Sequence, residues 1–101
     1  MFALKKLFGT KPDLKAIKEK GAIILDVRTA GEFKTGHIPG SLNIAVDHVA
    51  SYAEELKKKN KPVITCCRSG ARSAVAESIL KNAGIEVYNG GSWNELLKEL
   101  V

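Results

Sequence analysis

Residues 62–73 constrain the fold of this chain more than any other segment. An apolar run at 62–66 has the length of a buried strand, and a helical pattern starts at Ala71 after a few small and polar residues. This order indicates a strand, a tight loop and the N-terminus of a helix. Cys67 lies in that loop, where backbone N–H groups and the helix dipole favour thiolate over thiol.

Apolar runs and helical patterns alternate along the rest of the sequence. Strands are predicted at residues 22–27, 41–45, 62–66 and 85–88, and helices at 12–20, 29–35, 47–59, 71–83 and 92–100. Single helices between strands imply βα units. We therefore expect an α/β fold with a mainly parallel central sheet and helices on both of its faces.

The helix ends and helix faces can be predicted in more detail. Thr29 and Glu32 have the spacing of a capping box, Ser92 is an expected N-cap, and residues 89–91 are an expected tight loop. The expected apolar faces are Val49, Tyr52, Ala53 and Leu56 on one helix, and Ala74, Val75, Ile79 and Leu80 on another.

Length and composition indicate one folded domain. The 101 residues suffice for a single core, and 45% hydrophobic with 27% charged residues is ordinary for a globular protein. Residues 1–11 are expected to be an N-terminal arm or a leading strand, since they fit neither a signal peptide nor a membrane span. The net charge of +5 comes largely from lysines typical of solvated helix faces, so no nucleic acid is expected. A cytoplasmic monomer is the expectation.

The two cysteines are adjacent and cannot form a disulfide framework, which suits a reducing compartment. Because side chains alternate along a strand, Cys66 and Cys67 should point in opposite directions. This favours a core position for Cys66 over a role as a resolving thiol. The sequence has no CxxC motif, and His37 and His48 lack ligand spacing, so neither a metal nor another cofactor is expected.

The residues that follow Cys67 favour a bound anion or an anionic sulfur. Gly70 permits a positive φ, and Ser69 and Ser73 have hydroxyls that can donate to sulfur, although Ser73 could instead face the sheet. Arg68 is expected to point outward. Arg72, in the first helical turn, opposes the helix dipole, so it either serves a bound anion or anchors the loop.

Residues 26–28 follow another predicted strand. Ligands bind at the carboxyl ends of the strands in open parallel sheets, so this segment and the Cys67 loop should meet at one site.

Five motifs in order resemble those of a single-domain rhodanese over residues 12–100, nearly the whole chain. They are DVR at 26–28, EF at 32–33, GHIPGSLNI at 36–44, CRSGARS at 67–73, and YNGG at 88–91 with Trp93. The chain departs from many members in the short spacer before Trp93, which affects the rim of the pocket.

The resemblance implies one rhodanese-like domain over residues 1–101 and sulfurtransferase activity through a cysteine persulfide. By match of motif, Cys67 is the catalytic cysteine, with a cradle of Arg68, Ser69, Gly70, Ala71, Arg72 and Ser73. Asp26 and Arg28 match the supporting pair near the family's pocket, and His37 matches a loop-holding residue rather than a general base. The implied donor is a small anion such as thiosulfate, and the acceptor is cyanide in vitro or a cellular thiol or protein.

Two alternatives remain open from the sequence. One is a persulfide carrier or protein-binding module without multiple turnover. The other is a cysteine phosphatase or arsenate reductase, whose loop resembles CxxxxxR. Here Cys67 and Arg72 form the shorter CxxxxR, which encloses less space and suits one extra sulfur atom better than a tetrahedral phosphate.

Overall fold

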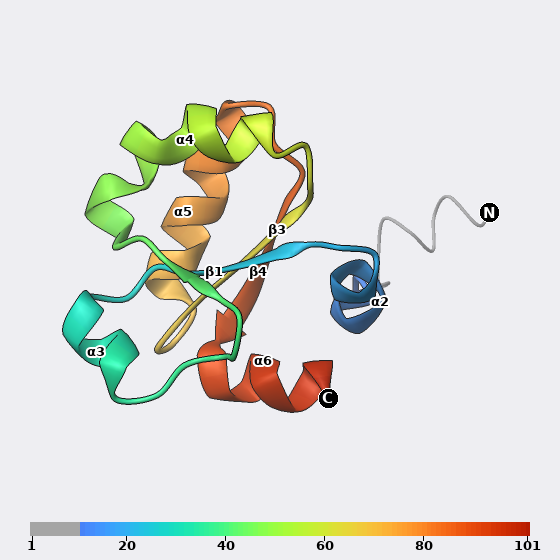
Figure 1. Cartoon of the computed structure of the whole chain (residues 1–101), viewed down its shortest axis with the longest axis vertical. Coiled ribbons are helices and arrows are strands. Elements are labelled where there is room, and N and C mark those ends of the chain that lie inside the picture. Colours follow the sequence, from blue (N-terminus) through green and yellow to red (C-terminus); the bar gives the residue numbers. More distant parts are fainter. Residues whose placement is uncertain (1–10) are drawn as a thin grey trace.

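The computed structural model describes residues 11–101, which form an α/β fold (Figure 1). In chain order the elements are α2 (Leu14–Glu19), β1 (Ile23–Asp26), α3 (Ala30–Lys34), β2 (Leu42–Asn43), the 3₁₀ helix η1 (Val46–His48), α4 (Val49–Lys58), β3 (Val63–Cys67), α5 (Ala71–Asn82), β4 (Val87–Ser92) and α6 (Trp93–Leu100). The predicted fold class is confirmed. The expectation for residues 1–11 falls, apart from Lys11, outside the described residues.

The sheet has the strand order β2-β1-β3-β4, and every pairing among the described strands is parallel. Asp26 at the end of β1 lies opposite Cys66, the next-to-last residue of β3. All five residues of β3 are buried, as expected for a continuous apolar run in the centre of a parallel sheet.

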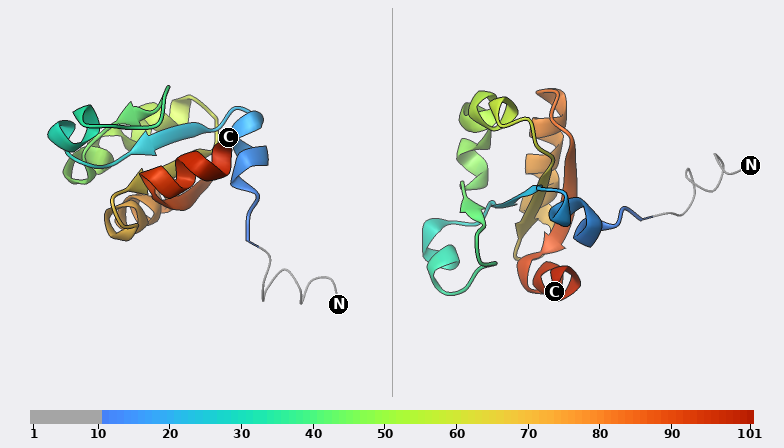
Figure 2. Two further views of the ribbon diagram at one scale, coloured as in Figure 1. Left: turned by 90° about the horizontal axis from the view of Figure 1, so that it is seen from below. Right: turned by 45° about the vertical axis from the view of Figure 1, so that its right-hand side comes forward.

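Helices cover both faces of the sheet (Figure 2). Each face has its own apolar cluster. On one face α4 and α5 contribute Val49, Leu56, Ala76 and Leu80. On the other face α2 and α6 contribute Leu14 and Leu96. Cys67 belongs to the α4–α5 face and Cys66 to the α2–α6 face, so the predicted opposite orientation of the two thiols is confirmed.

The helix starts were predicted with mixed success. The capping box of α3 is present: the Thr29 side chain accepts from the Glu32 N–H, and the Glu32 carboxylate accepts from the Thr29 N–H. At α6 the prediction was wrong in part. Ser92 is the N-cap residue and also ends strand β4, but its side chain makes no capping hydrogen bond.

The predicted tight loop at residues 89–91 is wrong, because β4 continues through it to Ser92. The register between β3 and β4 shifts at this point, and Gly91 has a φ of +80°. A Cβ on Gly90 would lie 2.8 Å from both the Thr65 carbonyl oxygen and Leu96 Cδ2. The glycines therefore serve an irregular strand that closely approaches β3 and α6.

Part of the predicted apolar face of α5 is also wrong. Ala74 and Val75 are exposed, the latter by 53%, whereas Ser73, Ala76 and Leu80 are buried. The Cys67 loop sets the rotation of this helix and turns the Ser73 side chain toward the sulfur, which moves Val75 to the outside. On α4, Tyr52 is likewise 42% exposed rather than buried.

Candidate active site

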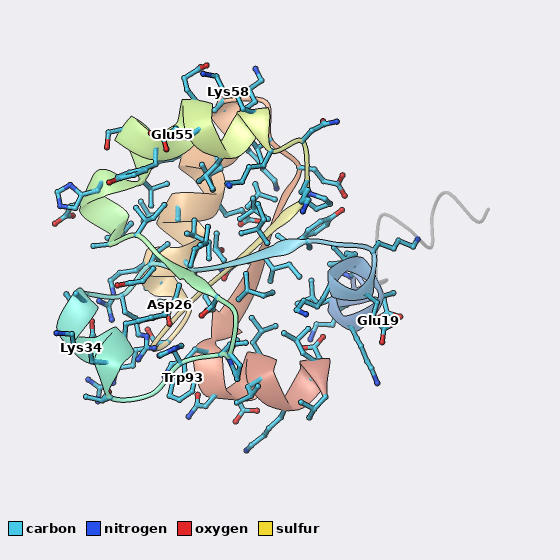
Figure 3. All side chains as sticks on the ribbon, in the orientation of Figure 1. Glu19, Asp26, Lys34, Glu55, Lys58 and Trp93 are labelled. Carbon is cyan, nitrogen blue, oxygen red and sulfur yellow. The ribbon has the colours of Figure 1, made fainter. Side chains whose placement is uncertain are left out.

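Cys67 is the last residue of β3, and three residues separate it from the first residue of α5. Residues 26–28 follow the neighbouring strand β1 and reach the same edge of the sheet, since Asp26 pairs in register with Cys66. The structure thus brings together the two segments that the sequence placed at one edge. In Figure 3, Asp26 and Trp93 lie at this end of the sheet, close to α3.

The Cys67 sulfur is enclosed by hydrogen-bond donors from the loop that follows it. The Gly70 N–H donates to Sγ at 3.0 Å and the Ser73 N–H at 3.4 Å, while the Ser73 Oγ lies 3.4 Å from Sγ. Gly70 has a φ of +101°, a left-handed conformation that favours glycine and turns the chain back over the sulfur. Cys67 itself is only 1% exposed.

These contacts set the ionisation of the thiol. Burial by itself raises the pKa of Cys67, but hydrogen bonds from the Ser73 side chain and from the N–H groups of Ser73, Gly70 and Ser69 outweigh it. The pKa of the Cys67 thiol is therefore lowered. The N-terminus of α5 adds the positive end of a helix dipole at the same point. The site is built to hold an anionic sulfur.

Cys66 has the opposite environment. It is fully buried in the apolar cluster with Ile64 and Leu96. Burial, and secondarily the charge of Asp26, raises the pKa of the Cys66 thiol to about 12. The predicted core position of Cys66 is confirmed.

Arg72 anchors the loop to α3. Its Nη1 donates to Glu32 Oε1 at 2.7 Å and its Nη2 donates to Oε2 at 3.0 Å. Arg72, together with the Thr29 N–H, lowers the pKa of Glu32 to about 2. Of the two roles that the sequence left open for Arg72, the structure shows the anchoring contact.

Asp26 and Arg28 form a buried ion pair with Nη2 of the arginine 2.6 Å from Oδ2 of the aspartate. The same Arg28 Nη2 donates to the Gly36 carbonyl at 2.7 Å, and Nη1 donates to the Glu32 carbonyl at 3.2 Å. Its guanidinium carbon lies 4.8 Å from the centre of the Trp93 ring. The pair therefore holds the segment after β1 and the start of α6 in place.

Arg68 differs from the other two arginines because it is exposed and forms no ion pair among residues 11–101. It borders a depression of about 310 Å³, which is also lined by Arg28, Glu32, Thr35, Trp93 and Asn94. His37 instead holds its own loop: Nδ1 lies 2.8 Å from the Phe33 carbonyl oxygen, and the ring stacks on Phe33.

Asn89 is a site residue that the sequence reasoning missed. Its amide contacts Ser73 Oγ and the Gly70 carbonyl, so it reaches the Cys67 loop from β4. The available signals were its place in the YNGG motif at 88–91 and its position directly after the predicted strand 85–88. They were missed because residues 89–91 were expected to be a tight loop rather than part of a strand.

Within residues 11–101, no group of three or more His, Cys, Asp or Glu side chains is placed to hold a metal ion. Over the same range, none of the helices has the length and apolar character needed to cross a membrane.

A family model described as the rhodanese-like domain matches residues 10–98. The chain is 32% identical over 76 residues to thiosulfate sulfurtransferase GlpE of Pseudomonas savastanoi, which covers 74% of this chain and 71% of that protein. It is 31% identical over 91 residues to the tRNA sulfurtransferase of Thermoplasma acidophilum, covering 90% of this chain but spanning only 18% of that relative. A solved structure, a rhodanese with anions from E. coli, superimposes with a TM-score of 0.68 at 28% identity, covering 74% of this chain and 91% of the other.

Proposed function

The chain belongs to the rhodanese-like sulfurtransferase family, and from this premise we propose that it transfers sulfane sulfur through a persulfide on Cys67. The proposal also takes residues 12–100 as one domain, since both apolar clusters pack on a single sheet. The observation that supports it most is the set of N–H donors on Sγ, at 3.0 Å from Gly70 and 3.4 Å from Ser73.

In the first step, the Cys67 thiolate attacks the outer sulfur of a donor such as thiosulfate. The bond between the two donor sulfurs breaks, sulfite leaves with the bonding electron pair, and a Cys67 persulfide anion remains. No general base is needed, because the loop already favours the thiolate. The same preorganised N–H groups can stabilise the negative charge of the persulfide.

In the second step, a thiophilic acceptor attacks the outer sulfur of the persulfide. With cyanide, the sulfur–sulfur bond breaks, thiocyanate leaves and the Cys67 thiolate is restored. A cellular thiol or a protein cysteine would take the sulfur in the same way. Arg68, exposed at the rim, and the net charge of +5 suit an anionic donor.

Two features weigh against phosphatase or arsenate reductase chemistry on this loop. Four residues separate Cys67 from Arg72, one fewer than in the CxxxxxR pattern. In addition, both terminal nitrogens of Arg72 are occupied by the Glu32 carboxylate rather than free for a tetrahedral anion. We expect no hydrolysis of an aryl phosphate by the wild-type chain.

The intact mass of the protein after treatment with thiosulfate tests the proposal. We expect one added sulfur atom that maps to Cys67 and is removed by cyanide. Cys67→Ser should take up none, whereas Cys66→Ser and Cys66→Ala, as matched controls, should take up sulfur like the wild type. If the wild-type chain forms no such adduct, the persulfide proposal is overturned and the alternative of a protein-binding module is favoured.

Turnover separates an enzyme from a carrier. Repeated formation of thiocyanate from thiosulfate and cyanide would indicate an enzyme. A single equivalent, released only to a protein or thiol acceptor, would indicate a carrier.

A further inference from the structure

The hydroxyl of Ser73 lies between the Cys67 sulfur and the Asn89 side chain of β4, within hydrogen-bond distance of both. It has one hydrogen to donate, and three acceptors are in reach: Asn89 Oδ1 at 2.7 Å, the Gly70 carbonyl oxygen at 3.1 Å and Cys67 Sγ at 3.4 Å. Ser73 is fully buried, so water does not offer a fourth. Only one of these acceptors can hold the hydrogen at a time.

Asn89 is arranged to hold this hydroxyl and to remain satisfied without it. Its Oδ1 also accepts from the Gly91 N–H at 2.9 Å, so it keeps a donor when the Ser73 hydroxyl turns away. Its Nδ2 donates to the Gly70 carbonyl at 3.2 Å. The Asn89 amide thus holds the carbonyl group of Gly70 in place. The N–H of the same glycine donates to the Cys67 sulfur.

We propose that Asn89 is a positioning residue for the Cys67 sulfur and that it acts through the Ser73 hydroxyl. In the thiol state, the Cys67 S–H donates to Ser73 Oγ, and the Ser73 hydroxyl donates to Asn89 Oδ1. When the thiol loses its proton to solvent, the hydroxyl rotates and donates to the thiolate. A hydrogen bond to a charged acceptor is stronger than one to a neutral amide, so the charge on sulfur decides the rotation.

The charged groups around the loop do not replace the Ser73 hydroxyl as the donor that responds to the ionisation of Cys67. Those nearest the site are paired with each other, Asp26 with Arg28 and Glu32 with Arg72, while Cys66 lies on the opposite face and Arg68, Asp47 and His48 are exposed. The proposal rests on Cys67 as the sulfur-carrying residue. The test measures the ionisation of Cys67 and needs no sulfur donor. The role of Asn89 can therefore be overturned while sulfur transfer is observed, and sulfur transfer can be absent while the role of Asn89 is supported.

The test is the thiol pKa of Cys67, obtained from the pH dependence of its alkylation by iodoacetamide in the full chain and mapped to the peptide. Ser73→Ala removes the hydroxyl donor and should raise this pKa by about one unit. Ser73→Thr keeps a hydroxyl at the same position and should restore most of the shift. Ser78→Ala, an exposed serine on the same helix, is the control and should leave the pKa unchanged.

Asn89→Asp tests the partner. A carboxylate at this position would hold the Ser73 hydrogen more strongly and add a negative charge, so the pKa of Cys67 should rise by more than in Ser73→Ala. In the Ser73→Ala background, the shift caused by Asn89→Asp should become smaller. Equal pKa shifts in the two backgrounds would mean that the introduced carboxylate acts only through its charge and not through Ser73, which would overturn the proposal. Asn82→Asp, at the exposed end of α5, is the matched control.

The wild-type chain provides a measurement that does not depend on a variant folding. The side-chain amide resonances of Asn89 should shift with pH at the midpoint found for Cys67. That shift should become smaller in Ser73→Ala. An Asn89 amide that does not respond to Cys67 ionisation, or a Ser73→Ala chain with an unchanged thiol pKa, would overturn the proposal.

Discussion

Cys66 and Cys67 are neighbours in the chain, yet their sulfurs lie on opposite faces of one sheet and in opposite chemical environments. Cys66 is packed among apolar side chains, and burial raises the pKa of its thiol to about 12. Cys67 is equally buried, but donors from the following loop surround its sulfur and lower its pKa. The comparison teaches that burial alone does not decide the reactivity of a cysteine; the hydrogen-bond donors around the sulfur do.

The largest expected effect is a difference in alkylation between the two thiols of the native chain. At pH 7 a thiol pKa of about 12 leaves a thiolate fraction of about 10⁻⁵ at Cys66. We expect iodoacetamide to modify Cys67 at least about 10³-fold faster than Cys66, as measured by peptide mapping. In denaturant the two rates should converge. Comparable native rates would contradict the difference in environment described here.

The next effect compares the two apolar clusters. Leu80 on the Cys67 face and Leu96 on the Cys66 face are both fully buried. Leu80→Ala and Leu96→Ala should each lower the free energy of unfolding by about 2–5 kcal/mol in a denaturant titration. Val75→Ala, at a position 53% exposed, should change it by less than about 0.5 kcal/mol.

These substitutions also separate packing from reactivity. Because the loop N–H groups set the thiol pKa, Leu96→Ala should leave the pH profile of Cys67 alkylation unchanged in the folded chain. A shifted profile would mean that the core on the far face of the sheet controls the sulfur as well.

The smallest effect concerns the ion pair between Arg72 and Glu32, which connects the start of α5 to α3. Glu32→Gln removes the charge that faces Arg72, while glutamine can still complete the capping box with Thr29. We expect a small fall in melting temperature near neutral pH, since the pair is partly exposed.

The pH dependence of that difference has a definite sign. The folded-state pKa of Glu32 is depressed to about 2, so the contribution of the pair is fully present above the ordinary pKa of a glutamate. It should be lost as the pH falls from about 4.5 to about 2. Thermal melts of the wild type and Glu32→Gln should therefore converge in that range, and a difference that grows toward acid would contradict the assignment.

Much of the fold followed from local sequence patterns. The apolar run at 62–66 and its neighbours predicted parallel strands, and the spacing of Thr29 and Glu32 predicted a capping box that is present. The predictions failed at β4 and α5 for a common reason. At both places, contacts with the Cys67 loop or with β3 overrode the local pattern, as with Gly90 against Thr65 and Ser73 beneath the sulfur.

The sequence by itself determined the class of fold, the edge of the sheet where the site lies, and Cys67 as the candidate sulfur, because these depend on periodicity and on motifs close together in the chain. Only the tertiary structure decided which distant residues hold the loop around that sulfur. Arg72 meets Glu32 across 40 positions and Ser73 meets Asn89 across 16, and such pairings arise from packing the elements together rather than from any local pattern.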